Sequence, residues 1–118
     1  MALLAPVKNP SPVAITTTPT DIDSTGYYYH HITIFFTSTI QTGDEYLIEY
    51  FKYDPVAADW SFHDWDVVNF VTTQNHDGTG GQLKAWELNP TPGSGFRARI
   101  TKVSGNNGTV NYEIIRAA

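Results

Sequence analysis

The chain has 118 residues, a formal charge of −5 and no cysteine. One domain of this size can bury a core without metal or disulfide support, and the missing cysteine excludes a disulfide framework and a Cys-based zinc site. The seven Lys and Arg residues are scattered, which excludes the clustered basic surface of a nucleic-acid-binding protein. No apolar run approaches the roughly 20 residues that cross a bilayer. The start, MALLAPVKNP, lacks the basic region of a secretory signal, so we expect neither a membrane segment nor export by the usual route.

The first 25 residues contain four prolines among Thr, Ser, Val and Ala. Proline lacks an N–H and biases the residue before it towards extended backbone, so no helix is expected there. We predict an extended, proline-rich N-terminal arm over residues 1–25, followed by a β-sandwich domain over residues 26–118. Residues 13–18 (VAITTT) fit either an extended lead-in or a strap that pairs with a neighbouring subunit.

A long strand is predicted over residues 27–41 (YYYHHITIFFTSTIQ). Tyr28, Ile32, Ile34, Phe36 and Ile40 share one face because side chains alternate along a strand. The opposite face is also partly apolar, which predicts a central strand with a covered or partner-binding outer side.

Further strands are predicted over residues 45–53, 65–74 and 82–88, separated by loops at 54–59 and 75–81. No stretch longer than ten residues has helical periodicity. Six or seven short strands with turn clusters between them predict an all-β fold, a single antiparallel β-sandwich that is Ig-like or jelly-roll-like.

The last quarter of the chain has the clearest alternation, over residues 96–103 and 109–116. It predicts a hairpin around the Gly- and Asn-rich loop 104–108. In the predicted register Ile100 pairs with Tyr112, Ala98 with Ile114 and Arg99 with Glu113. We expect the following residues of this segment to be buried: Phe96, Ile100, Tyr112 and Ile114, with Arg97, Arg99 and Glu113 facing outward.

The residues that could carry catalysis do not form a recognisable constellation. His30 and His31 are adjacent and point to opposite faces of a strand, and no His-x-His or helical pair supplies a zinc site. Carboxylate pairs such as Asp21 with Asp23 suit a glycosidase, but turn-forming Asp explains them more simply. There is no nucleophile elbow and no P-loop lysine. We therefore predict that the protein is not an enzyme and needs no metal and no cofactor.

Aromatic residues are the stronger functional signal. They suit a platform for sugar rings, hot spots of a protein interface or the core of a sandwich, and the core is expected to hold at least half of them. The residues in question are Trp60, Phe62, Trp65, Trp86, Tyr27, Tyr29 and Tyr53.

Residues 44–118 resemble a module of tailed-bacteriophage virion proteins. In that module a strand, an Asp-bearing loop and a Trp precede a C-terminal "F/Y-R-A-R-V-T … G … V-x-Y" segment. The corresponding residues are Asp59-Trp60, then 96–101 (FRARIT) and 110–112 (VNY). The loop departs from the pattern because it lacks the Gly, and residues 61–94 depart from it in length.

The resemblance implies a structural virion protein, a head decoration (cement) protein that binds and stabilises the phage capsid. Its partners would be the major capsid protein or other virion subunits. It would bind as a monomer or homotrimer, at the capsid surface, after assembly in the host cytoplasm. Two alternatives stay open, a carbohydrate-binding β-sandwich module and a phage tail or adaptor component. The candidate partner-binding residues lie in the arm and on the outer side of strand 27–41: Pro10, Pro12, Val13, Ile15, Tyr27, Tyr29 and Phe35.

Overall fold

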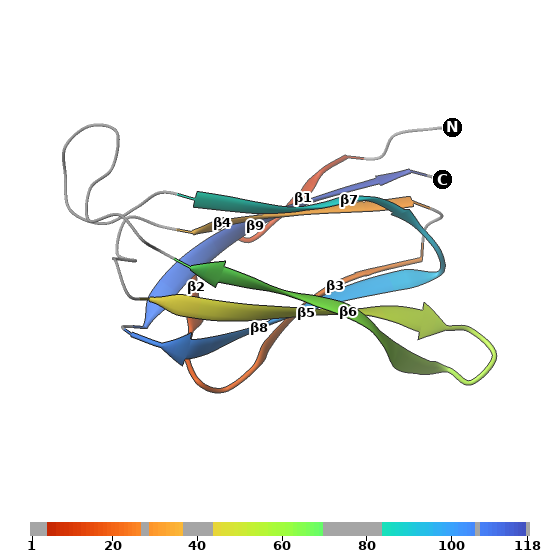
Figure 1. The fold of residues 1–118 in the computed structure, drawn as a ribbon. Helices are drawn as coiled ribbons and strands as arrows, with labels where there is room; N and C mark the ends of the chain where they lie inside the picture. The colour runs from red at the N-terminus through yellow and green to blue at the C-terminus, as the bar shows by residue number, and fades with distance from the viewer. Residues whose placement is uncertain (1–4, 27–28, 37–43, 70–83, 106, 118) are drawn as a thin grey trace.

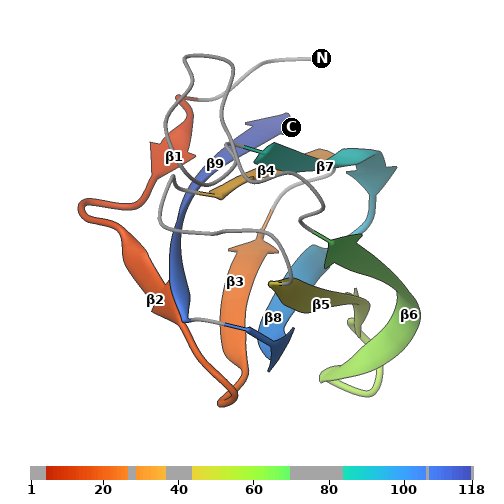
Figure 2. The same cartoon turned by 60° about the vertical axis from the view of Figure 1, so that its left-hand side comes forward.

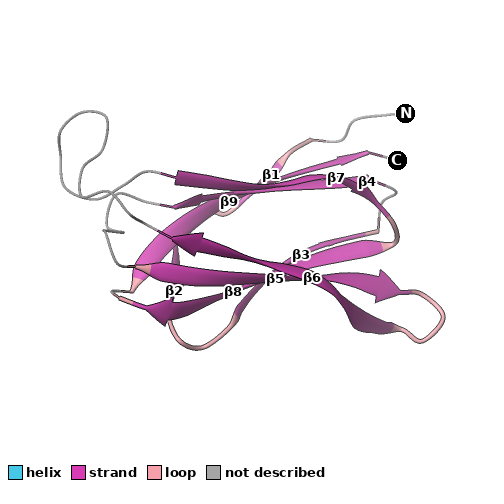
Figure 3. Ribbon diagram, in the orientation of Figure 1, coloured by secondary structure: helices cyan, strands magenta, loops and turns pink. Residues whose placement is uncertain are grey.

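The computed structural model describes residues 5–26, 29–36, 44–69, 84–105 and 107–117. Within these ranges the chain forms strands, turns and bends, and no helix. Two antiparallel sheets are packed face to face (Figure 1, Figure 3). The predicted all-β antiparallel sandwich is confirmed.

Each sheet is built from strands that are far apart in the sequence. Sheet A contains β1 (Val7–Lys8) and β2 (Val13–Ile15), which both pair with β9 (Gly108–Ala117), then β4 (Tyr29–Phe36) and β7 (Lys84–Pro92). Sheet B runs in the order β3 (Thr20–Thr25), β8 (Gly95–Ser104), β5 (Glu45–Asp54) and β6 (Asp59–Asn69).

The pairing is nested along the chain. The first strands, β1 and β2, pair with the last, β9; then β3 pairs with β8, β4 with β7 and β5 with β6. The same strand pairs would form if the whole chain were one long hairpin. When such a hairpin is wrapped around the core, successive strand pairs fall alternately in sheet A and sheet B. The contacts β9–β4 and β8–β5 then complete the two sheets. This is the jelly-roll arrangement, one of the two architectures that the sequence predicted.

The predicted C-terminal hairpin is wrong. Ile100 of β8 pairs with Ile48 and Thr20 in sheet B, whereas Tyr112 of β9 pairs with Ile34 in sheet A. The segment after β8 therefore crosses from one sheet to the other instead of turning back along the same sheet. Local alternation cannot distinguish these two connections, because both keep the same residues facing the core.

The predicted faces of these two strands hold despite the wrong pairing. Phe96, Ile100 and Ile114 are buried and Tyr112 is half-buried against the core. Arg97, Arg99 and Glu113 alternate with them and are partly exposed. The period-two pattern fixed the face of each residue, and the neighbour of each strand was decided by the rest of the chain.

The N-terminal residues form part of the sheets. After β2 the chain turns and returns as β3, so that it passes from sheet A to sheet B (Figure 2). The Lys102 N–H donates to the Thr16 carbonyl at 2.9 Å and holds this crossover against β8. Strands thus occupy much of the range that the sequence assigned to an extended arm, and their main-chain partners belong to the same chain.

Strand β6 begins earlier than predicted, at Asp59 instead of residue 65. It forms a hairpin with β5, whose turn is held by Asp54 Oδ1 accepting from the N–H groups of Val56 at 2.9 Å and Ala57 at 3.1 Å. His63 is an extra residue, because Phe62 faces Phe51 and Asp64 faces Tyr50. Such a bulge breaks the alternation on which the sequence prediction depended. Parts of the strands predicted at 27–41, 65–74 and 82–88 lie outside the described residues.

The core lies between the sheets and draws apolar side chains from both. Trp86 also bridges the sheets at one side, where its indole N–H donates to Asp66 Oδ2 at 3.0 Å. The buried residues of this cluster are Ile15, Ile22, Ile32, Ile34, Phe36, Tyr46, Ile48, Val68, Trp86, Phe96, Ala98, Ile100, Val110 and Ile114.

We predict that Ile100→Ala lowers the free energy of unfolding by about 2–5 kcal/mol, because the side chain is fully buried and its removal leaves a cavity. Val103→Ala is the matched control on the same strand; Val103 is 53% exposed, and the change should cost about 0.5 kcal/mol or less. Urea unfolding measures both. Equal costs for the two variants would contradict the assigned faces of β8.

Candidate functional site

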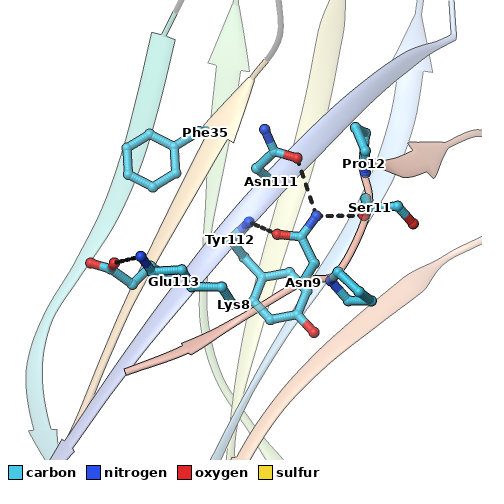
Figure 4. A pocket seen from close by; sticks show the side chains of 9 residues that line it. Lys8, Asn9, Ser11, Pro12, Phe35, Asn111, Tyr112 and Glu113 are labelled. Atoms are coloured by element: carbon cyan, nitrogen blue, oxygen red, sulfur yellow. Dashed lines mark hydrogen bonds and ion pairs between the residues drawn. The ribbon is translucent and has the colours of Figure 1, made fainter. Parts of the chain in front are cut away.

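Three of the residues predicted to bind a partner meet in one pocket. Pro10, Pro12 and Phe35 line an open depression of about 430 Å³ at the edge of sheet A (Figure 4). The segment between β1 and β2 passes over β9 here, and Phe35 of β4 lies on the other side, 44% exposed.

The Asn9 side chain holds this pocket in shape. Its Oδ1 accepts from the Tyr112 N–H at 2.8 Å, while its Nδ2 donates to the Ser11 carbonyl at 2.6 Å and to Asn111 Oδ1 at 3.1 Å (Figure 4). The amide therefore takes the place of a main-chain partner where β1 and β2 leave a gap along β9. Both polar atoms of the Asn9 side chain are engaged in these hydrogen bonds within the chain. A ligand in the pocket would therefore contact mainly the other residues that line it.

The other predicted partner-binding residues do not join the pocket. Ile15 is fully buried in the core, which makes it inaccessible to a partner in the folded chain. Val13 is half-buried and pairs with Val110 of the same chain. Tyr29 is half-buried in β4, and Tyr27 lies outside the described residues.

A buried serine–histidine pair lies between the sheets. Ser24 Oγ is 2.6 Å from His30 Nδ1, and His30 Nε2 is 2.9 Å from the Gly93 carbonyl. Because a carbonyl only accepts, Nε2 carries a proton, and in the neutral ring Nδ1 accepts from the serine hydroxyl. The distance suits a nucleophile and its base, but both residues are 1% exposed and no substrate reaches them. The pair joins sheet B to sheet A.

We predict that Ser24→Ala lowers the free energy of unfolding by about 1–3 kcal/mol, because the buried hydrogen bond between the Ser24 hydroxyl and His30 Nδ1 is lost. Thr25→Ala, at the exposed neighbouring position, is the control. Chemical denaturation of the two variants compares them. A Ser24→Ala protein as stable as the wild type would show that the bond does not support the fold.

The most distinctive surface is the outer face of sheet B. Its residues alternate with the buried residues of the same strands, and cross-strand pairing aligns them in rows. One row runs Asp23, Arg97, Phe51 and Phe62; the next runs Asp21, Arg99, Glu49 and Trp65; Tyr53 faces Trp60 at the end. We call this set of ten residues the aromatic–arginine face.

Both arginines of this face are fixed by bidentate ion pairs. Arg97 donates through Nε and Nη2 to the Asp23 carboxylate at 2.7 and 2.9 Å, and Arg99 does the same to Asp21 at 2.8 and 3.3 Å. The hydrogen bond from Arg99 lowers the pKa of Asp21 below its usual 3.8. The hydrogen bond to Asp23 raises the pKa of Arg97. The two guanidinium groups are thus held in place as charged pairs.

Each guanidinium also lies over an aromatic ring. The Arg97 Cζ atom is 4.4 Å from the centroid of Trp60, and the Arg99 Cζ atom is 4.9 Å from that of Phe51, which are cation–π distances. Gly95 makes room for Trp60, because a Cβ at this position would lie 3.3 Å from the far end of the indole and 3.1 Å from Tyr53 Cβ. The indole consequently lies close over the backbone of β8.

Two aromatic side chains of this face stay open to a partner. Phe62 is 56% exposed and Trp65 is 55% exposed, side by side along the outer strand β6. Neighbouring rings of the face pack edge to face. The interplanar angle is 79° between Phe51 and Phe62 and 84° between Tyr53 and Trp60. The face therefore presents a stepped apolar surface with fixed charges, and not a set of coplanar rings.

Sequence reasoning named four of the five aromatic residues of this face, all except Phe51, without placing them together. The bulge at His63 hid the strand that carries Trp60, Phe62 and Trp65, and the wrong hairpin placed Arg97 and Arg99 beside β9. The spacing of Trp60 and Phe62 at i, i+2 was the available signal, since it fits a strand continuing directly from the turn.

Within the described ranges, no group of three His, Asp or Glu side chains could hold a metal ion. Nor does that part of the chain contain a helix long and apolar enough to cross a membrane. Comparisons with known protein families, curated proteins and solved structures found no match to this chain.

The ion pair of Asp21 predicts a pH dependence. Because its folded pKa lies below 3.8, it stabilises the fold fully above that pH, and the stabilisation is lost as the pH falls through the folded pKa. We expect Asp21→Asn to cost about 1 kcal/mol or less at pH 6, since the pair is partly exposed. Urea unfolding between pH 6 and pH 2 should show the difference from the wild type shrinking below pH 3.8. A difference that is constant or grows on acidification would contradict the lowered pKa.

Proposed function

We propose that this chain is a non-enzymatic structural protein of a bacteriophage virion, a decoration protein that attaches to the capsid shell through the aromatic–arginine face. Its partner would be the major capsid protein or another virion subunit, and its place would be the capsid surface. The observation that carries the binding role is a rigid sheet face with Trp, Tyr and Arg side chains, the residues that dominate protein–protein hot spots.

The state of these side chains before binding supports the proposal. Arg97 and Arg99 are already held by carboxylates and rings, so they have little rotamer freedom left to lose. Ordering long side chains at an interface costs about 0.5–1.5 kcal/mol each, and a pre-ordered face avoids much of that cost. A surface that served only solubility would not need this arrangement.

The resemblance to phage virion proteins gains physical support on the same face. Its Asp59-Trp60 and FRARIT parts are far apart in the sequence, yet Arg97 stacks on Trp60. The third part, 110–112, lies in the other sheet and does not contribute. By analogy of fold alone, jelly rolls occur in viral capsid domains and in lectins, which suits the proposal and its alternative.

The fold leaves the N-terminal arm a smaller part in binding than the sequence predicts. The sequence offers residues 13–18, with Val13 and Ile15, as a strap that pairs with a neighbouring subunit. The β2 strand that contains them already pairs with β9 of its own chain. The exposed prolines of the segment before it, Pro10 and Pro12, stay available for a side-chain contact.

The carbohydrate-binding alternative rests on the exposure of Phe62 and Trp65. A sugar platform needs rings whose flat faces are free, and here Trp60 and Phe51 lie under guanidinium groups. That geometry favours a protein partner.

We predict that the purified chain sediments with empty shells of the phage that encodes it, and that Trp65→Ala weakens this binding by roughly 30-fold, the effect of a 2 kcal/mol hot spot. Phe35→Ala tests the pocket of sheet A, where a comparably exposed ring lies, and should leave binding unchanged if the aromatic–arginine face carries it. Retention on a glycan array without shell binding would replace the proposal with the carbohydrate alternative. Binding to purified tails alone would indicate a tail component.

A further inference from the structure

The aromatic–arginine face and the β6 edge beside it hold most of the chain's excess negative charge. Three cations, the guanidinium groups of Arg97 and Arg99 and the ammonium of Lys52, stand against six carboxylates, an excess of three in a chain of formal charge −5. Strand β6 contains no Lys or Arg. The carboxylates in question are Asp21, Asp23, Glu49, Asp59, Asp64 and Asp66.

The neighbouring positive charges neutralise the β6 side only in part. Lys52 of β5 stands opposite Ser61 of β6, and Asp59 is among the carboxylates that raise the pKa of Arg97. Arg97 and Arg99 are each committed to a carboxylate of β3, on the far side of the sheet from β6. Lys102 of β8 donates its Nζ to the Gly105 carbonyl. Asp64 and Asp66 pair with Tyr50 and Ile48, so their exposed carboxylates lie at the β6 edge on the other side of the strand from Phe62 and Trp65. Asp66 also accepts the indole N–H of Trp86.

These aspartates also cover the open edge of sheet B. Asp59, Asp64 and Asp66 each accept, through Oδ1, the N–H of the following residue at 2.8 Å. Along an outer strand every second N–H points away from the sheet and can pair with a foreign strand. The N–H groups that are covered in this way belong to Trp60, Trp65 and Val67. A partner that added a strand here would have to displace three carboxylates, so contact through side chains is favoured.

We infer that the surface which docks on this face is basic. Its apolar side chains pack on Phe62 and Trp65, and its Lys or Arg side chains reach Asp59 and Asp64 at the β6 edge. A second copy of the chain does not fit, because it would bring the same excess of carboxylates against itself. The identity of the partner as a capsid subunit rests on the proposed function, whereas the charge of the partner is inferred from the carboxylates of the face and of the β6 edge.

The test compares two charge variants of equal net charge. Asp59→Asn with Asp64→Asn removes two charges at the β6 edge, and the amide oxygens can still accept the N–H groups of Trp60 and Trp65. Glu87→Gln with Glu113→Gln removes two charges from sheet A and serves as the control. Shell binding is measured by sedimentation from 50 to 500 mM salt.

We expect the Asp variant to bind about fivefold to tenfold more weakly than the wild type at low salt, and its binding to depend less on salt. The control should bind as the wild type does. The inference is overturned if the Asp variant binds like the wild type, if the control loses as much affinity, or if wild-type binding does not weaken with salt. A salt-independent interaction would point to a neutral partner such as a glycan.

A peptide titration separates this inference from the proposed function. Blocked Lys-Leu-Lys-Leu-Lys and Glu-Leu-Glu-Leu-Glu peptides are added to the labelled full chain, and the indole N–H resonances of Trp65 and Trp86 are followed. The basic peptide should shift Trp65 and leave the buried Trp86 unchanged, and the Asp variant should lose the shift. If shells are not bound but this response is found, the capsid proposal fails and the basic partner stands. If shells are bound but neither peptide acts differently from the other, the inference fails alone.

Discussion

The register of β8 between β3 and β5 is the constraint on which the rest of the structure depends. Phe96, Ala98 and Ile100 point into the core from this strand, while Arg97 and Arg99 point outward between them. A slip of one residue would bury both guanidinium groups and expose three core side chains. The same register places Arg97 opposite Asp23 and Arg99 opposite Asp21, so the fold and the outer face are determined together.

Local sequence patterns predicted correctly which residues of a strand face the core, but they predicted wrongly which strands lie next to each other. Alternation over 96–103 and 109–116 gave the correct inward and outward residues of both strands, because that pattern depends on the strand alone. It could not show that β8 and β9 join different sheets, since a five-residue loop permits a hairpin or a crossover. The choice depends on strands 70 to 80 residues away, such as β3 pairing with β8, which no local rule contains.

The aromatic–arginine face shows the same division. The sequence shows which Trp, Phe and Arg residues are present. That these residues lie on one face depends on the bulge at His63 and on the nested strand pairing, which the sequence pattern does not reveal. The bulge shifts the parity of β6, so that Trp60 and Phe62 before it share a face with Trp65 after it. Read as a regular strand, the segment 59–69 would place these rings on opposite sides. The structure explains the irregular pattern as a single bulged strand.

An exposed apolar edge strand is normally a hazard, because its free N–H groups can pair with any other strand. Here the aspartates that precede Trp60, Trp65 and Val67 cover those groups and place like charges along the edge, which oppose pairing with another copy of the strand. This protection leaves Phe62 and Trp65 free to stay exposed without inviting strand exchange. On the inference drawn above, the same carboxylates favour a basic partner that contacts them through its side chains. If that inference holds, protection of the edge and selection of a partner are two consequences of one arrangement of charge.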